Sequence, residues 1–220
     1  MNSNDFDLRA KALEIHERLV NIYGEPRRRH PDPVTALVST IISQNTNDRL
    51  RDRAFQRLHE RFPTWEQVRD APVEELTEAI RPAGLAQQKA PRIKEALQRI
   101  TYERGELSLD FLRDMDVEEG KAWLTSINGV GPKTAAIVLL FSLGKPAFPV
   151  DTHVHRVSRR LGLIGPKTTR EQAHLLLEEL LPIEIYYTFH LNMVAHGRQV
   201  CKASQPRCGI CGLHSMCEYL

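Results

Sequence analysis

A short stretch near the middle of the chain, Ile127–Ala136, combines two glycines, a proline and a lysine directly before an apolar run. Gly129 and Gly131 can adopt positive φ and allow another backbone to approach closely. Proline is favoured at the first position of a helix. The stretch therefore predicts a tight turn that leads directly into a buried helix beginning at Pro132. Turn amides beside a helix N-terminus form a site suited to phosphate.

Lys133 lies in the first turn of that predicted helix. The positive end of the helix dipole disfavours a protonated amine there, and a neutral lysine can act as a nucleophile. A first-turn lysine is more often simply solvated, so the turn alone indicates this chemistry without establishing it.

Most of the chain has the pattern of short helices. Apolar residues recur at helical spacing between Gly, Pro and capping residues, and no segment shows sustained alternation of apolar and polar residues. We therefore predict an all-α protein of about ten to twelve short helices. A length of 220 residues is sufficient for one or two domains with a substantial core.

The charge balance and the N-terminus restrict the partners and the location. The net charge is only +2, so binding to nucleic acid would need a local basic face, such as Arg27-Arg28-Arg29. No apolar run is long enough to span a membrane. The polar, acidic N-terminus has the pattern of neither a signal peptide nor a transit peptide. We expect an intracellular protein of the cytoplasm or nucleoid, with no membrane partner.

All four cysteines follow residue 200, in the pattern Cys201-x6-Cys208-x2-Cys211-x5-Cys217. This density, in a chain without a secretory signal, indicates metal or cluster ligation rather than disulfides. Zinc sites favour paired C-x2-C motifs, and only one such pair is present. The uneven spacing favours a cubane iron–sulfur cluster held by one loop, with zinc as the alternative.

Asp151 follows Lys133 beyond one predicted helix. If that helix packs back on the turn, the amine and the carboxylate would line one cleft, which is the apparatus of Schiff-base chemistry at a sugar carbon. The alternative is that Asp151, or Thr152, only caps the next helix. His153, His155 and His196 are not spaced like zinc ligands.

Three motifs occur in order: Gly129-Val-Gly-Pro-Lys133-Thr-Ala, then Val150-Asp-Thr-His153, then the cysteine pattern. Together they resemble the endonuclease III family of helix-hairpin-helix DNA glycosylases, over nearly the whole chain from about Pro33 onward. The resemblance implies a two-lobed all-α fold with a DNA cleft between the lobes. The implied parts are an N-terminal helix in 1–26 packing on the iron–sulfur domain, a six-helix barrel domain in 27–144 and a C-terminal iron–sulfur domain in 145–220.

The resemblance also implies an activity. The family's activity is that of a bifunctional DNA glycosylase/AP lyase of base excision repair. It removes oxidised pyrimidines and cleaves 3′ to the abasic site by β-elimination through a lysine Schiff base. The implied partner is double-stranded DNA containing damaged bases or abasic sites, the implied cofactor is a [4Fe-4S] cluster, and a monomer is expected. A lysine nucleophile disfavours the adenine and thymine-mismatch glycosylase branches, which lack it.

Two alternatives remain. One is an enzyme that acts mainly as an AP lyase, and the other is a non-catalytic iron–sulfur module that binds DNA. The pairing of Lys133 with Asp151 disfavours the module, because binding alone requires neither residue.

The family's roles transfer to residues of this chain by motif position. Lys133 matches the lysine that attacks C1′ of the damaged nucleotide, and Asp151 matches the aspartate that assists departure of the base. Gln44 matches a glutamine that fills the gap left by the flipped nucleotide, and Leu85 matches a leucine that wedges into the stack. The remaining implied contacts are with DNA, at Ile127, Gly129, Val130, Gly131, His153 and Arg207, and with the cluster, at Cys201, Cys208, Cys211 and Cys217.

The sequence departs from the family pattern at several positions. Asn128 stands where the family usually has proline, and Pro132 where a basic residue is common, which predicts a weaker phosphate contact. The loop after Gln44 is one residue longer than is usual. Ser204 and Gln205 stand where basic residues are frequent, which predicts weaker DNA binding through the cysteine loop.

Overall fold

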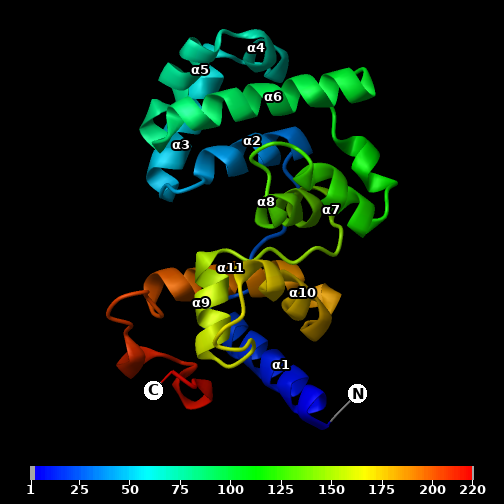
Figure 1. Ribbon diagram of the computed structural model, residues 1–220. Coiled ribbons are helices and arrows are strands. Elements are labelled where there is room, and N and C mark those ends of the chain that lie inside the picture. The colour runs from blue at the N-terminus through cyan, green and yellow to red at the C-terminus, as the bar shows by residue number, and fades with distance from the viewer. Residues whose placement is uncertain (1–2, 220) are drawn as a thin grey trace. The chain divides into compact units, whose positions relative to one another are not determined.

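The computed structural model describes residues 3–219 (Figure 1). These residues form eleven α-helices and no strand, which confirms the predicted all-α class. None of the described helices is long and apolar enough to cross a membrane. The helices are α1 (Ser3–Tyr23), α2 (Pro33–Ser43), α3 (Asp48–Arg61), α4 (Trp65–Asp70), α5 (Val73–Ile80), α6 (Ala86–Arg104), α7 (Val117–Thr125), α8 (Pro132–Ile137), α9 (Thr152–Arg160), α10 (Arg170–Leu180) and α11 (Tyr186–Gln199).

The helices belong to two compact units. Helices α2 to α8 lie in a unit of residues 30–145. Helix α1 joins α9, α10, α11 and the cysteine tail in a second unit, made of the chain up to Arg29 and from Pro146 onward. The N-terminal helix therefore packs with elements that lie more than a hundred residues away in the sequence.

Helix α2 is the apolar centre of the 30–145 unit. Asp32 caps it, because its Oδ2 accepts a hydrogen bond from the backbone N–H of Thr35 at 2.7 Å. Its buried residues lie on most faces, and only a narrow line of Thr35, Ser39 and Ser43 is half-exposed, so the helix must be covered on several faces. Helices α3, α6 and α8 pack against it. Leu37 and Ile41 are fully buried, and each such side chain contributes about 1.5–3 kcal/mol relative to exposure.

The predicted glycine turn forms between α7 and α8. The backbone N–H of Val130 donates to the carbonyl of Ile127 at 3.0 Å and closes the turn. Gly129 has a φ of 80°, and a Cβ at this position would lie 2.5 Å from Cδ of Arg92. The backbone conformation therefore favours glycine here, and any larger residue would also displace the flexible side chain of Arg92. Gly131 differs from the prediction: its φ of −95° and ψ of 177° are extended values open to any residue.

The helix after the turn changes its hydrogen-bonding pattern halfway along. Helix α8 ends at Ile137, and Val138–Ser142 continue as a π-helix. Leu139 in this segment is fully buried, and its carbonyl accepts from the backbone N–H of Lys145 at 2.9 Å. The apolar pattern predicted one continuous helix. It could not reveal the π segment, because such a segment keeps the same residues buried and changes only the backbone hydrogen bonds.

Helix α11 is the centre of the second unit and packs against α1 and α9. Its residues Phe189 and Met193 are fully buried. Helix α9 begins after Asp151, whose Oδ1 accepts from the backbone N–H groups of His153 at 2.8 Å and Val154 at 2.7 Å. Asp151, and not Thr152, is therefore the N-cap of α9.

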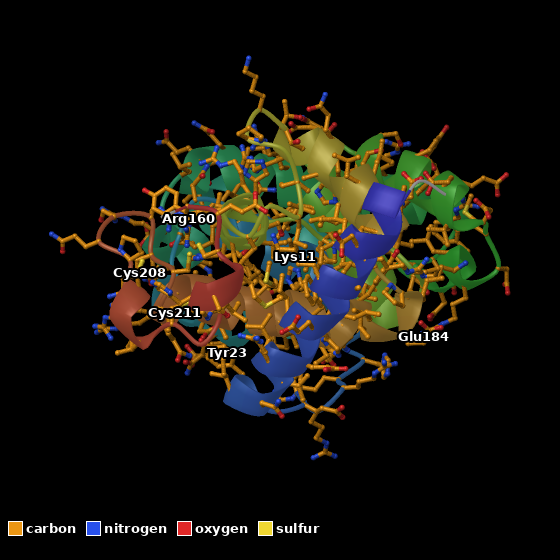
Figure 2. All side chains as sticks on the ribbon, turned by 90° about the horizontal axis from the view of Figure 1, so that it is seen from below. Lys11, Tyr23, Arg160, Glu184, Cys208 and Cys211 are labelled. Atoms are coloured by element: carbon orange, nitrogen blue, oxygen red, sulfur yellow. The ribbon has the colours of Figure 1, made fainter. Side chains whose placement is uncertain are left out.

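The cysteine tail packs along α1, as Figure 2 shows for the segment with Cys208 and Cys211. Lys11 forms an ion pair with Glu218 at 2.6 Å. Arg18 donates to the hydroxyl of Ser215 at 2.9 Å. A Cβ at Gly212 would lie 2.8 Å from the side chain of Ile22, so the tail backbone lies directly on this helix. Exposed ion pairs contribute little to stability, and their value here is to fix the register of the tail on α1.

Candidate active site and cysteine centre

Lys133 is the second residue of α8 and follows the glycine turn directly. Its neighbours Thr134 and Ala135 are buried, so the start of the helix is held by the core. The side chain of Lys133 is itself half-buried. A half-buried lysine at a fixed helix start is a geometry suited to a lysine nucleophile.

Gln44 lies against this turn. It is the C-cap of α2, and its Nε2 donates to the carbonyl of Gly129 at 2.9 Å. The two residues are 85 positions apart in the sequence. The bond fixes the loop after α2 to the turn that precedes Lys133. The structure therefore brings together two motifs whose proximity the sequence could suggest only through the family resemblance.

Leu85 stands immediately before α6 in a left-handed conformation, with a φ of 51° and a ψ of 29°. This conformation costs a residue with a Cβ about 1–2 kcal/mol. The side chain is 48% exposed and contributes little to the core. Backbone strain concentrates at functional sites, and an exposed leucine on a strained turn is suited to contact a ligand. Its role as a wedge stays a prediction.

The residues of the glycine turn, 127 to 131, differ in which of their atoms a ligand could reach. Ile127 and Val130 are 2% and 4% exposed, so neither presents its side chain to a ligand. Gly131 is exposed, and a Cβ there would meet no described atom within 4 Å. Neither the fold nor the packing requires glycine at 131. Its missing side chain leaves the backbone of the turn open to approach from outside.

Asp151 is half-buried and uses Oδ1 for both of its capping bonds. Among the described residues, no hydrogen bond to its Oδ2 is present. The capping function predicted as the alternative is therefore real, and it leaves one carboxylate oxygen available. Asp151 and Lys133 belong to different compact units, so their pairing stays a prediction.

His153 is held by Arg156 on the next turn of α9. Nδ1 of His153 lies 3.1 Å from Nη2 of Arg156, and the same guanidinium donates to the carbonyls of Gly197 and Cys201 at 2.8 and 3.0 Å. Burial is the main cause that lowers the pKa of His153, and Arg156 lowers it further. A neutral ring that accepts from the guanidinium fits this surrounding.

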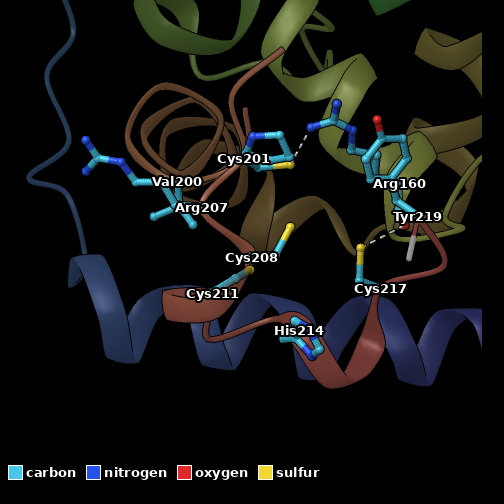
Figure 3. Close-up of a pocket in the computed structure, with 10 residues that line it drawn as sticks. Arg160, Val200, Cys201, Arg207, Cys208, Cys211, His214, Cys217 and Tyr219 are labelled. Atoms are coloured by element: carbon cyan, nitrogen blue, oxygen red, sulfur yellow. Dashed lines mark hydrogen bonds between the residues drawn. The ribbon is translucent and has the colours of Figure 1, made fainter. Parts of the chain in front are cut away.

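The four cysteines line one cavity, shown in Figure 3, which is partly open to solvent. Cys201 follows α11, Cys208 begins the 3-10 turn Cys208–Ile210, Cys211 follows that turn, and Cys217 follows the turn His214–Met216. Four thiols around one space are the donor set that a cysteine-held cluster requires. Arg207, directly before Cys208, is exposed.

Arg160 is a component of this centre that the sequence analysis missed. It is 6% exposed, and its Nη1 donates to Sγ of Cys201 at 3.3 Å. Its carbonyl accepts from the thiol of Cys217 at 3.4 Å, and its guanidinium lies 4.0 Å from the ring centroid of Tyr219. The buried cation offsets negative charge on sulfur. The only signal in the sequence is its i, i+4 spacing from Arg156.

The thiols oppose one another's ionisation. Burial raises the pKa of the Cys211 thiol, and Cys201, Cys217 and Cys208 raise it further. Four thiolates therefore need a cation or a cationic cluster between them. Among the described residues, no three His, Cys, Asp or Glu side chains are grouped as ligands of a metal ion. The fit to a cofactor consequently rests on the shared cavity and its four thiols.

The structure thus has a tight glycine turn between two helices, a lysine at the start of the second helix and an aspartate at the start of a later one. Residues 38–183 match the HhH-GPD superfamily of base excision DNA repair proteins. Endonuclease III of Thermotoga maritima is 36% identical over 208 residues, which cover 94% of this chain and 91% of the relative. The chain therefore belongs to the HhH-GPD superfamily and, within it, to the endonuclease III family.

Two further likenesses agree with this assignment. A putative DNA glycosylase of Arabidopsis thaliana is 36% identical over 189 residues, or 85% of this chain, and the match spans 64% of that longer relative. A solved structure described as a trapped endonuclease III–DNA covalent intermediate superposes with a TM-score of 0.82 at 29% identity. The superposition covers 100% of this chain and 97% of that one.

The strain at Leu85 leads to a stability prediction. Glycine normally destabilises a position relative to alanine by about 0.5–1 kcal/mol. At a left-handed position the order reverses, because alanine retains the steric cost. We expect Leu85→Gly to be more stable than Leu85→Ala by about 1 kcal/mol, measured by urea unfolding of the two variants. Equal stability, or a more stable alanine variant, would show that the backbone at Leu85 is unstrained.

Proposed function

We propose that this chain is a bifunctional DNA glycosylase and AP lyase of base excision repair that acts on oxidised pyrimidines in double-stranded DNA. The observation that carries the proposal is the placement of Lys133, an amine on the first turn of a buried helix, directly behind a turn with an open backbone. Family membership and the likeness to a covalent DNA intermediate support the same reaction.

In the proposed reaction the neutral amine of Lys133 attacks C1′ of the damaged nucleotide, and the base leaves with the electron pair of the glycosidic bond. Opening of the sugar ring gives an imine between Lys133 and C1′. Loss of a proton from C2′ then expels the 3′ phosphate by β-elimination, which cuts the strand. Water hydrolyses the imine and returns the lysine. Because the start of α8 is fixed by the core, positioning contributes to the rate.

Asp151 would supply a carboxylate to the same nucleotide. Positive charge develops on the sugar as the base departs, and a nearby carboxylate stabilises it. The capping bonds of Oδ1 hold the side chain in one orientation, while Oδ2 accepts no hydrogen bond among the described residues. A pre-oriented carboxylate of this kind needs little reorganisation at the moment of reaction.

The contacts with DNA would come from loops and from backbone. The open backbone at Gly131 suits a phosphate, since no side chain blocks its amide surroundings. Extruding a nucleotide costs a few kcal/mol, least at a damaged pair. Gln44 and the exposed Leu85 would offset part of that cost by refilling the stack. Arg207 is exposed and would contact a phosphate.

The cysteine cavity would hold a [4Fe-4S] cluster through Cys201, Cys208, Cys211 and Cys217. When bound, such a cluster supplies a rigid cross-link between four points of one loop and leaves the sugar chemistry to protein side chains. The chain's own contribution is the buried guanidinium of Arg160 beside Cys201. The tail that carries exposed Arg207 would thereby be held in one shape.

Borohydride trapping tests the nucleophile. With a duplex that contains thymine glycol or an abasic site, the wild-type protein should give a covalent protein–DNA band, because borohydride reduces the imine to a stable amine. Lys133→Gln should reduce the band to background while the fold is kept. The matched control is Lys121→Gln, which removes another half-buried lysine, one on the preceding helix that pairs with exposed Glu118 at 2.8 Å.

The same assay separates the alternatives. Trapping at the abasic site alone would identify an enzyme that is mainly an AP lyase. A protein that binds the duplex yet traps neither substrate would be a DNA-binding module, and the proposed reaction would be wrong.

Asp151→Asn tests the carboxylate. Asparagine caps helices as well as aspartate does, so the variant should unfold at nearly the same urea concentration as wild type. Excision of thymine glycol should fall about 100-fold, while trapping at a preformed abasic site persists. Asp116→Asn, which alters the N-cap of α7 in the same way, is the control. Undiminished excision by Asp151→Asn would reduce Asp151 to a cap.

The cofactor is tested by colour and by analysis. Protein purified without oxygen should be brown, with absorbance near about 410 nm and about four iron and four sulfide per chain. Cys211→Ser should lose the absorbance, because one corner of the cluster then lacks its thiolate. A colourless protein with one bound zinc would establish the alternative drawn from the single C-x2-C pair.

A further inference from the structure

Lys89 is a buried lysine with no part in the proposed reaction. It lies in the first turn of α6 and is 1% exposed, which makes it one of the largest fully buried side chains of the protein. Its Nζ donates to the carbonyl of Ile42 at 2.8 Å and to the carbonyl of Ala83 at 3.0 Å. Lysine is almost never fully buried unless it is paired, so this placement has a cost that the two bonds must offset.

The two carbonyls lie at corresponding places in the 30–145 unit. Ile42 is close to the C-terminal end of α2, two residues before Gln44. Ala83 ends the 3-10 segment Arg81–Ala83, two residues before Leu85. Carbonyls at the ends of helical segments lack a partner within the segment. Lys89 supplies both with a partner, and so joins the roots of the two loops that carry Gln44 and Leu85.

The backbone of Lys89 strengthens this connection. Its N–H donates to the carbonyl of Leu85 at 3.0 Å, so both its backbone and its side chain hold the Leu85 turn. On the other loop, Gln44 donates onward to the carbonyl of Gly129 in the turn before Lys133. The bonds form a continuous path from Leu85 through Lys89 and the end of α2 to Gln44 and the glycine turn.

Burial lowers the pKa of Lys89, and no charged side chain is among the causes of the shift. A neutral amine still has two N–H groups, which is the number that the two carbonyls require. The bridge therefore survives a change in protonation. An apolar residue of similar length would fill the same space and leave both carbonyls without a partner.

We propose that Lys89 is a positioning residue that sets the separation and orientation of the Gln44 and Leu85 loops, so that both side chains enter the DNA stack together. The inference rests on the proposed function and assigns a role to a residue that does not touch DNA. Without a shared bond, each loop could shift independently of the other. One amine that donates to a carbonyl at the base of each loop makes the positions of the two loops interdependent. Misplacement of a positioning group by about 1 Å can cost about 100-fold in rate.

The test compares a substrate that requires insertion into a stack with one that does not. Single-turnover excision is measured on a thymine glycol duplex, and borohydride trapping is measured on a single-stranded abasic oligonucleotide. Lys89→Met should slow duplex excision by about 10- to 100-fold, and should leave single-strand trapping within about twofold of wild type. Activity of the wild-type protein on both substrates tests the proposed function separately from the role of Lys89.

Lys94→Met is the matched control. Lys94 lies on the same helix, and its Nζ likewise donates to one backbone carbonyl, that of Ala71 at 2.5 Å, but Ala71 is distant in sequence from both loops. It should lose stability without changing the ratio of duplex to single-strand activity. An equal change of that ratio in Lys94→Met would show that general loosening of α6 explains the effect.

A double-mutant cycle makes the assignment specific. In a Gln44→Ala, Leu85→Ala background the loops carry nothing to insert, so adding Lys89→Met should change duplex excision by no more than about twofold. A full further loss in that background would overturn the proposal, as would equal losses on duplex and single strand. If Lys89→Met does not fold, Lys89→Gln replaces it, since the amide keeps donors in the same space. Failure of both to fold would assign Lys89 to folding alone.

Discussion

The packing of helix α8 against helix α2 is the contact on which the candidate site depends. It places the start of α8, with Lys133, beside the C-terminal end of α2, with Gln44. The hydrogen bond from Gln44 to Gly129 then fixes the turn to that end. Because buried residues lie on most faces of α2, the helix is held from several directions by α3, α6 and α8. The buried core thereby fixes the positions of polar loop residues such as Gln44, although these residues are not part of the core.

Backbone conformation limits which residues can form the site. Gly129 has a positive φ that a residue with a side chain rarely adopts, so the fold favours glycine there. Gly131 has an extended backbone and open space around it, so the fold does not require glycine there. A ligand that approaches the turn from outside is the better reason for a glycine at this position. Leu85 adopts a left-handed conformation with an exposed apolar side chain. The fold carries this strain at the loop tip, where it is expected in a residue selected for contact with a ligand.

In the second unit, helix α9 connects the proposed carboxylate with the cysteine centre. Asp151 caps its beginning, Arg156 donates to the carbonyl of Cys201, and Arg160 donates to the sulfur of the same residue. The two arginines lie one turn apart on the face toward α11 and the tail. The buried guanidinium of Arg160 stabilises negative charge on sulfur, and both arginines donate to carbonyls of the tail. The tail and the start of α9 are therefore connected through one helix.

Much of the fold followed from local patterns. The all-α class, the turn before Pro132, the cap at Asp151 and the grouping of the cysteines all depend on residues near one another in the chain, and the structure contains each of them. Local patterns failed at two places near the turn. Gly131 did not need the positive φ expected of it, and the π segment after Ile137 leaves no trace in the apolar spacing.

The sequence by itself determined the chemical groups: an amine behind a glycine turn, a carboxylate at a helix start and four thiols in one short tail. Only the tertiary structure decided which of these groups share surroundings. It joined Gln44 to the turn across 85 residues, buried Arg160 against Cys201 and set Lys89 between the carbonyls of Ile42 and Ala83. The physical reason is that periodicity and capping act within one or two turns of chain. A buried polar side chain takes its partner from whichever segment the packing of the core brings next to it.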